Sequence, residues 1–283
     1  MRWSYVEPCC GSAAVALALL GARRPLLPYQ GSKWRFRKSL LARFVQLGFF
    51  GRPAHLALHD VGPWGVVAPT VVDPAGRAAV LDQLRLLERL DPRAVYDALH
   101  QQVVPVDRAT FSAQFLFLQR LAYSGKAVGD GDGRWASPGF NTSSAYGLPG
   151  TDRFGKVNPM IPSLIKVLEG YDTLGPGPTV EGARQAAVAP SQPVTQPTLV
   201  YLDPPYASST GYPGGSLGRE EVVQLASAWC AAGATVVVSE SEALPELVDA
   251  GWEGTLLDPG RSDTSRFRGK QQEWITVGVP SPG

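Results

Sequence analysis

Short apolar runs and longer amphipathic stretches alternate along most of the chain. Apolar runs of roughly four to eight residues, bounded by Gly, Pro or acidic residues, are typical of strands. Such runs predict strands at 3–8, 54–60, 198–202, 234–241, 252–258 and 273–279, with a further short strand near Val180. Amphipathic spacing, which is typical of helices, occurs at 11–21, 34–50, 218–233 and 243–251. This alternation predicts an α/β fold whose parallel sheet is covered by helices on both faces.

The middle of the chain departs from this alternation. Gly and Pro punctuate 62–76, which predicts a loop. Helical patterns then occur at 77–90, 92–102, 108–125 and 162–170. The long segment 126–155 is rich in Gly and Ser but contains Trp135, Phe140 and Tyr146, so we expect an ordered, protruding hairpin there. Residues 62–165 therefore form a helical insert between two parts of the sheet domain, 1–61 and 166–283.

Charge and composition narrow the possible partners. The formal net charge is +1, so a nucleic-acid surface has to come from local basic clusters such as residues 33–38. The alternative for that cluster is a solvated helix face. Cys9, Cys10 and Cys230 form neither a disulfide framework nor a zinc-ligand spacing, which favours a cytoplasmic setting. Sparse histidines, no evident signal peptide and no apolar run of about 18 residues lead us to expect no metal and no membrane partner.

The stretch TLVYLDPPYASSTGY, residues 198–212, ends an apolar strand at an acid. In open α/β sheets, ligands bind outside the carboxyl ends of the strands, where Asp203 is expected. The Asp203 carboxylate and the Pro204 carbonyl are both hydrogen-bond acceptors, and an exocyclic amino group has two N–H donors. Tyr206 follows closely enough to stack on a flat ring. These parts suit a planar amine such as adenine or cytosine.

The nitrogen of such an amine is a poor nucleophile because its lone pair is delocalised into the ring. Two fixed acceptors push the nitrogen toward tetrahedral geometry and stabilise the positive charge that builds on it as it attacks a positively charged methyl donor. No strong base is needed beforehand, because the proton becomes acidic only after methylation. The alternative for this motif is a chance turn after a strand.

The sequence Asp203, Pro204, Pro205 and Tyr206 resembles the catalytic motif of amino-group methyltransferases that use S-adenosylmethionine. Other segments resemble the Dam-like class of DNA N6-adenine methyltransferases. YVEPCCGSAAVALAL is similar to the family's Gly-rich cofactor loop, in which backbone N–H groups approach the ligand. The matching residues are Glu7, Pro8, Gly11 and Ser12, whereas Cys9 replaces a Phe and Ala13 replaces the second Gly.

Two further resemblances complete the implied cofactor site, which also borders Asp203. PYQGSKWRFRKSLL resembles the family's W-x-G-G-K element, which lies near the cofactor's amino-acid end, and the match is carried by Tyr29, Gly31, Ser32 and Lys33. In Dam-like enzymes this element precedes the cofactor loop, whereas here it follows it. LALHDV resembles the family's second strand and implies that Asp60 accepts hydrogen bonds from the cofactor ribose, with a turn or helix N-cap role as the alternative. Gln185 is a candidate for the cofactor adenine.

The implied DNA-binding residues come from two regions. Residues 111–147 resemble the family's target-contacting helix and hairpin, with Arg120 bracing the fold and Val128 at the position of a base-reading arginine. The resemblance implies DNA contacts from Tyr123, Ser124, Lys126 and Arg134. RSDTSRFRGKQQEWITVGV resembles the family's basic carboxy-terminal stretch, whose side chains contact phosphates; the alternative is a solvated loop. The corresponding residues are Arg261, Arg266, Arg268 and Lys270.

The resemblance as a whole implies a monomeric, cytoplasmic enzyme that methylates N6 of a flipped-out adenine in double-stranded DNA at a specific site, as in restriction–modification. It implies a Rossmann-like methyltransferase sheet with its last strand antiparallel. The domains would be a cofactor-binding catalytic part, 1–61, a target-recognition domain, 62–165, and a catalytic part carrying the Asp-Pro-Pro-Tyr motif, 166–283. The alternatives are a methyltransferase acting on N4 of cytosine in DNA or on an RNA amino group, and a catalytically impaired DNA-binding relative.

Overall fold

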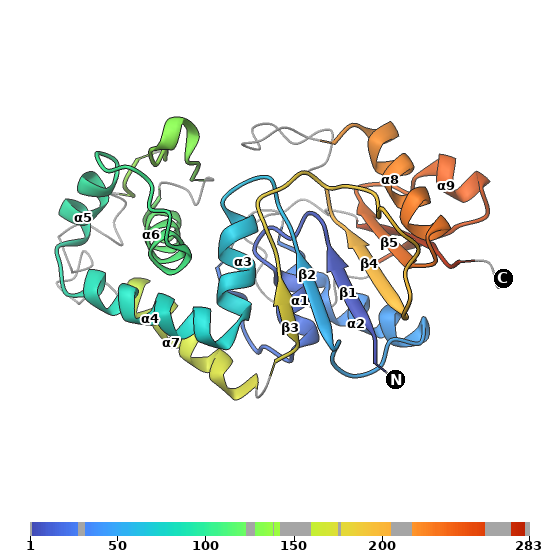
Figure 1. The fold of residues 1–283 in the computed structure, drawn as a ribbon, viewed down its shortest axis with the longest axis horizontal. Helices are drawn as coiled ribbons and strands as arrows, with labels where there is room; N and C mark the ends of the chain where they lie inside the picture. Colours follow the sequence, from blue (N-terminus) through green and yellow to red (C-terminus); the bar gives the residue numbers. More distant parts are fainter. Residues whose placement is uncertain are drawn as a thin grey trace.

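A computed structural model describes residues 2–27, 32–122, 128–137, 139–141, 160–174, 177–204, 217–257 and 273–280. Its seven-stranded sheet has the order β3-β2-β1-β4-β5-β7-β6 (Figure 1). The strands are β1 Ser4–Glu7, β2 His55–Leu58, β3 Thr179–Glu181, β4 Thr198–Leu202, β5 Thr235–Glu240, β6 Glu253–Leu256 and β7 Trp274–Gly278. The five strands from β3 to β5 pair in parallel, and β7 is antiparallel to both β5 and β6. The predicted α/β fold, with its mostly parallel sheet and antiparallel last strand, is confirmed.

Helices cover both faces of the sheet. The helices of the described ranges are α1 Ala14–Leu19, η1 Lys33–Phe36, α2 Arg37–Gln46, α3 Trp64–Val72, α4 Pro74–Glu88, α5 Pro92–Leu99, α6 Arg108–Leu121, η3 Gly131–Gly133, α7 Met160–Gly170, η4 Tyr171–Leu174, α8 Arg219–Ala231 and α9 Pro245–Asp249, of which α4 to α7 pack together beside the sheet (Figure 1). None of the helices in the described ranges is both long enough and apolar enough to cross a membrane.

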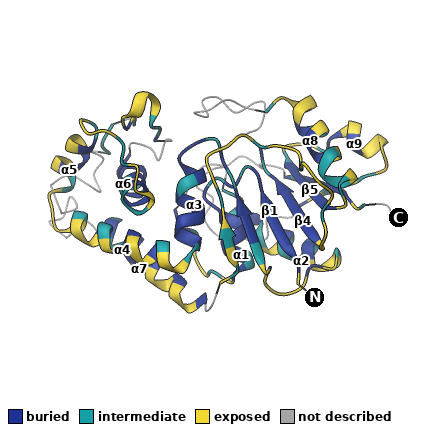
Figure 2. Ribbon diagram, in the orientation of Figure 1, coloured by how far each residue is buried: buried dark blue, intermediate teal, exposed yellow. Residues whose placement is uncertain are grey.

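Alternate strand residues separate into two buried clusters, as the period of two in a strand requires. Tyr5 on β1 and Tyr201 on β4 pack with α1 and α2, whereas Val6 and Val200 pack with α8 and α9 on the other face. The central strands are buried on both faces (Figure 2). This burial explains why the sequence shows continuous apolar runs there rather than alternating ones.

The helices of the middle segment begin at sequence signals that are easy to recognise. The carboxylates of Asp73, Asp91 and Asp107 each accept a hydrogen bond from a backbone N–H three residues later, at 2.7–2.8 Å. Pro74 and Pro92 take the first helical position, where a missing N–H costs nothing. These caps fix the starts of α4, α5 and α6.

The expectation of a loop at 62–76 is wrong, because Trp64–Val72 forms α3. Gly, Pro and β-branched residues lower the helix propensity of this stretch, and Pro69 even lies inside the helix. Burial overrides propensity: α3 is buried almost all round, and the rings of Trp64 and Phe115 lie 4.9 Å apart. Gly65 permits the close approach, since a Cβ there would lie 2.4 Å from the carbonyl oxygen of Asp60.

Part of the expected hairpin at 126–155 lies within the described residues. Gly129 and Ala136 pair in antiparallel orientation and exchange two hydrogen bonds of 2.8 Å. Val128 is buried and its N–H donates to Gln119, so its side chain faces the protein interior. Trp135 is also buried, and its indole N–H donates to Gln114. Tyr146 and most of the rest of this segment lie outside the described residues.

Candidate active site

Acidic residues end neighbouring parallel strands at one edge of the sheet. Glu7 ends β1, Asp60 follows β2 by two residues, and Asp203 directly follows β4. The order of the strands reverses between β1 and β4, because β2 and β3 lie on one side of β1, and β4 and β5 on the other. Such a switch point opens a crevice outside the carboxyl ends of the strands, where α/β proteins bind ligands. The topology therefore brings the three predicted acids to the place where a ligand is expected.

Asp60 is held by backbone donors. The N–H of Gly11, in the loop after β1, donates to its Oδ2 at 3.1 Å, and the N–H of Gly62 donates to its Oδ1 at 2.8 Å. Burial raises the pKa of Asp60, while these two N–H groups oppose the rise. The structure thus gives Asp60 the turn role that was its alternative interpretation. Each carboxylate oxygen has a further lone pair that could accept a hydrogen bond. The contact of Asp60 with a ribose hydroxyl stays a prediction.

The loop between β1 and α1 approaches the site closely. Gly11 has a φ of 44° and Ala13 a φ of 53°, both in the left-handed region that glycine adopts without strain. Ala13 stands at the position of the second glycine in the Dam-like loop that this segment resembles, so an alanine here takes a backbone conformation that favours glycine. Pro8 and Ser12 are buried beside it. Sequence analysis identified this departure, and the structure gives its conformational cost.

Glu7 is buried and accepts a hydrogen bond from the Tyr5 hydroxyl at 3.0 Å. Burial raises the pKa of Glu7 well above its usual range, and the negative charges of Asp203 and Asp60 add to the rise, while the hydrogen bond from Tyr5 opposes it. This electrostatic coupling means that the acids at the strand ends act on one another. A positive ligand between them would relieve their repulsion.

Lys33 turns inward from its basic neighbours. Its side chain is 5% exposed, and its Nζ lies 3.0 Å from Oδ1 of Asp203 and 3.0 Å from Oε1 of Glu273. Lys33 begins η1, where Ser32 precedes it as the cap: the N–H of Trp34 donates to the Ser32 Oγ at 3.4 Å. The predicted cofactor element is therefore adjacent to the predicted catalytic acid. Lys33 contributes nothing to a basic surface at residues 33–38, where Arg37 stacks on Trp34 instead.

The carboxyl group of Asp203 has a raised pKa. Burial raises its pKa to about 6, the Lys33 ammonium lowers it, and the negative charge of Glu273 raises it. Glu240, at the end of β5, has its pKa raised to about 7, mainly by burial. Strongly shifted carboxyl groups that cluster in a cleft are typical of functional sites. At neutral pH Asp203 is mostly ionised and hence an acceptor, as the predicted chemistry requires.

The other predicted site residues fall into two groups. Pro204 is buried next to Asp203, and Arg134 is exposed on the partial hairpin, where its backbone pairs with Val103. The remaining predicted residues lie outside the described residues: Tyr29, Gly31, Tyr123, Ser124, Lys126, Pro205, Tyr206, Arg261, Arg266, Arg268 and Lys270. Their roles stay predictions.

Sequence reasoning missed Glu273, Glu240 and Ser239. Ser239 is fully buried on β5 and donates to Oε1 of Glu273. The available signal was an isolated acid at each of two strand ends, Glu240 at the end of β5 and Glu273 just before β7. Within the described ranges, no group of three or more His, Cys, Asp or Glu side chains has a metal-binding arrangement.

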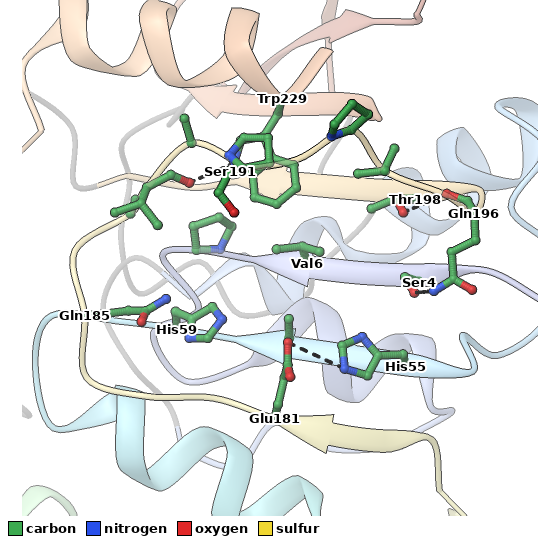
Figure 3. A pocket seen from close by; sticks show the side chains of 18 of the residues that line it. Ser4, Val6, His55, His59, Glu181, Gln185, Ser191, Gln196, Thr198 and Trp229 are labelled. Atoms are coloured by element: carbon green, nitrogen blue, oxygen red, sulfur yellow. Dashed lines mark hydrogen bonds and ion pairs between the residues drawn. The ribbon is translucent and has the colours of Figure 1, made fainter. Parts of the chain in front are cut away.

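A pocket of about 430 Å³ lies on the sheet face that carries Val6 and Ala57. Figure 3 shows Ser4 and Val6 of β1 beside His55 of β2 and His59, which directly follows β2, with Trp229 of α8 on the other side. Asp203, Lys33 and Glu273 do not line it. Gln185, the candidate for the cofactor adenine, does line it, and its N–H donates to the carbonyl of Asp60 at 3.0 Å. One end of the pocket therefore lies next to the acidic strand ends.

Comparisons with known proteins add little to this site. No protein-family model matches the sequence, and a comparison with curated proteins finds no match. Among solved structures, an rRNA methyltransferase, aviRa from Streptomyces viridochromogenes, is similar over 98% of this chain and 76% of its own, at 14% sequence identity and a TM-score of 0.33. A likeness at that TM-score carries no argument. The assignment to a Rossmann-like sheet of the methyltransferase type rests instead on this chain's own strand order and antiparallel β7.

Proposed function

We propose that this protein is an S-adenosylmethionine-dependent methyltransferase acting on the exocyclic N6 of a flipped-out adenine in DNA. The observation that supports it most is the position of Asp203. Its carboxylate stands at the end of β4, beside β1 at the switch point, and is followed by the carbonyl of Pro204. Two acceptors at this place match the two N–H donors of an aromatic amine.

The state of Asp203 supports this chemistry. The Lys33 Nζ lies 3.0 Å from Oδ1 of Asp203 and holds the carboxylate in place. The side chain is 18% exposed, so it is reachable from the crevice. Acceptors fixed in a buried site stabilise positive charge on the reacting nitrogen better than water does, because they need not reorganise. Once the nitrogen is methylated, its acidic proton can leave through Asp203 to solvent.

The described residues also fit the cofactor. The cations that act on Asp203 and Asp60 are themselves shared, Lys33 with Glu273 and Arg184 with Asp130, so the strand-end carboxylates can still accept a ligand with positive charge. The Gly11 loop brings backbone to the acid that would accept ribose hydroxyls. S-adenosylmethionine, when bound, supplies a methyl group on a positively charged sulfur.

The DNA part of the proposal rests on the resemblance and on the exposure of Arg134. An adenine inside a duplex cannot reach Asp203, so it has to leave the stack, at a cost of a few kcal/mol. Tyr206 would stack on it, and Arg134 and the basic residues 261–270 would contact phosphates. These contacts explain why we assign double-stranded DNA as the partner.

The test is transfer of a labelled methyl group from S-adenosylmethionine to genomic DNA and to total RNA, followed by chromatography of the nucleosides. We expect the label in N6-methyldeoxyadenosine. Label in N4-methyldeoxycytidine or in an RNA nucleoside would keep the amino-group chemistry and replace the substrate. Absence of transfer to every polymer, in protein that binds the cofactor, would favour the impaired DNA-binding relative.

A further inference from the structure

Glu273 is a buried carboxylate that contacts the side chains of Lys33 and Ser239. It is 1% exposed and lies directly before β7. The Lys33 Nζ lies 3.0 Å from its Oε1 and 3.2 Å from its Oε2, and the Ser239 hydroxyl also donates to Oε1. Its backbone carbonyl accepts from the N–H of Leu257 at 2.7 Å, which fixes the residue from the main chain as well.

The same ammonium serves Asp203. Lys33 Nζ lies 3.0 Å from Asp203 Oδ1, so two carboxylates share one cation. A continuous set of contacts runs from Ser239 on β5 through Glu273 and Lys33 to Asp203 after β4. Because Lys33 and Glu273 are almost fully buried, water screens their charges weakly, and the division of the ammonium between two carboxylates has a large effect on each.

The two limiting cases show what this division does. Without Lys33, a buried Asp203 would hold its proton at neutral pH and could donate but not fully accept. With Lys33 paired to Asp203 alone, the carboxylate would be neutralised and would be a weaker acceptor for an N–H group. Sharing the ammonium with Glu273 gives an intermediate state, in which Asp203 is ionised but its charge is not fully neutralised.

We propose that Glu273 is a positioning residue for Asp203: it holds the Lys33 ammonium between the two carboxylates and so sets the ionisation and acceptor strength of Asp203. This inference rests on the proposed function, since it assigns the network to the acid that would bind the amino group. It adds two residues, Glu273 and its anchor Ser239, that the sequence did not indicate.

Other titratable groups also act on Asp203 and have to stay constant in a test. They are Glu7 and Tyr5 on β1, Cys9 in the loop after it, Tyr201 on β4 and Glu240 on β5. Substitutions at Lys33 and Glu273 leave all of these in place. A difference between those variants therefore reports the charges of Lys33 and Glu273, and Ser239→Ala, which changes no charge, reports how Glu273 holds the ammonium.

The experiment measures the Asp203 titration directly, by carboxyl NMR of protein carrying isotope-labelled aspartate, with Asp203→Asn to assign the signal. In the wild type we expect a midpoint near 6. Lys33→Met should raise the midpoint by about 1–3 pH units, and Glu273→Gln should lower it by up to about one unit. Ser239→Ala should lower it less. Glu246→Gln is the matched control, because this exposed glutamate pairs with Arg219 on the surface, and it should change nothing.

A lower midpoint in both Glu273→Gln and the charge-neutral Ser239→Ala, together with a higher one in Lys33→Met, supports the proposal. An unchanged or raised midpoint in Glu273→Gln, with the control intact, would overturn it. If Glu273→Gln does not fold, Ser239→Ala decides, since it keeps every charge and removes the hydroxyl that donates to Glu273. An unchanged or raised midpoint there overturns the proposal.

The acidic limb of methyl transfer provides the functional readout. It should move with the NMR midpoint, to lower pH in Glu273→Gln and to higher pH in Lys33→Met, and Glu273→Asp, which keeps the charge, should return it toward the wild type. A purely structural role would lower activity at all pH values without moving the limb. If the wild type transfers no methyl group while the NMR shifts occur, the proposed function fails and the Lys33–Glu273 network stands.

Discussion

Asp60 and Asp203 occupy equivalent positions after neighbouring parallel strands on either side of β1, yet different groups satisfy them. Backbone N–H groups of Gly11 and Gly62 bind both oxygens of Asp60. The side-chain ammonium of Lys33, shared with Glu273, contacts Oδ1 of Asp203. Backbone donors carry no titratable charge and fix a loop, whereas a shared ammonium sets proton affinity. Asp60 therefore fixes the conformation of the loops that bind it, whereas the contacts of Asp203 set its ionisation.

Replacing the carboxylate of Asp203 should produce the largest effect of any single change. Asp203→Asn keeps the side-chain shape but substitutes an N–H₂ donor for an acceptor oxygen. We expect methyl transfer to fall by at least about 100-fold, with cofactor binding close to the wild type. Single-turnover transfer and calorimetry measure the two quantities. If Asp203→Asn lost methyl transfer and cofactor binding to the same extent, Asp203 would have no separate role in transfer, and its difference from Asp60 would disappear.

Removing Asp60 should affect the loop first. Asp60→Ala leaves the N–H groups of Gly11 and Gly62 without their acceptor, which should lower the free energy of unfolding by about 1–3 kcal/mol and weaken cofactor binding. Thermal unfolding and calorimetry measure these changes. The exposed Asp97→Ala, which loses only a surface pair with Arg93, is the control and should change stability by less than about 1 kcal/mol. If Asp60→Ala changed neither the free energy of unfolding nor the cofactor affinity, Asp60 would not fix the loops that carry Gly11 and Gly62.

The charge state of Asp203 should appear in the pH dependence of stability. Its pKa in the folded protein is about 6, above the ordinary 3.8, so the folded state binds the proton more tightly. That contribution to stability is complete below about pH 4 and is lost as the pH rises through about 6, a change of about 3 kcal/mol. Denaturant unfolding at several pH values measures it. The loss should be smaller in Asp203→Asn, which has no proton to bind; identical pH profiles would contradict the pKa shift.

The smallest effect on stability is expected from a substitution at Ala13, in the loop between β1 and α1 whose Gly11 N–H donates to Asp60. Ala13→Gly relieves a left-handed backbone that costs an alanine about 1–2 kcal/mol, but it removes a buried methyl group worth about 0.8 kcal/mol. Stability should therefore change by no more than about 1 kcal/mol, while cofactor affinity rises modestly as the loop opens. Calorimetry with both proteins measures this, and weaker binding by the glycine variant would contradict it.

The sequence predicted the three strand-end acids because each belongs to a local pattern, an apolar run that ends at a charged residue. It placed Lys33 near the cofactor through resemblance but not its partner Glu273, which lies 240 positions away. Glu273 follows two glutamines before a strand, and nothing local distinguishes it from a solvated residue. The helix α3 was missed for a related reason: its stability comes from burial against β2, β3 and α6, which no local propensity reports.

The most direct test of the account is calorimetric titration of the wild-type protein with S-adenosylmethionine. It addresses the central claim, that the acids after β1, β2 and β4 form the site of a cationic nucleoside cofactor, without requiring knowledge of the DNA sequence. The account predicts binding at one site, retained in Asp203→Asn and weakened in Asp60→Ala. No binding by folded wild-type protein, or binding indifferent to Asp60, would contradict it.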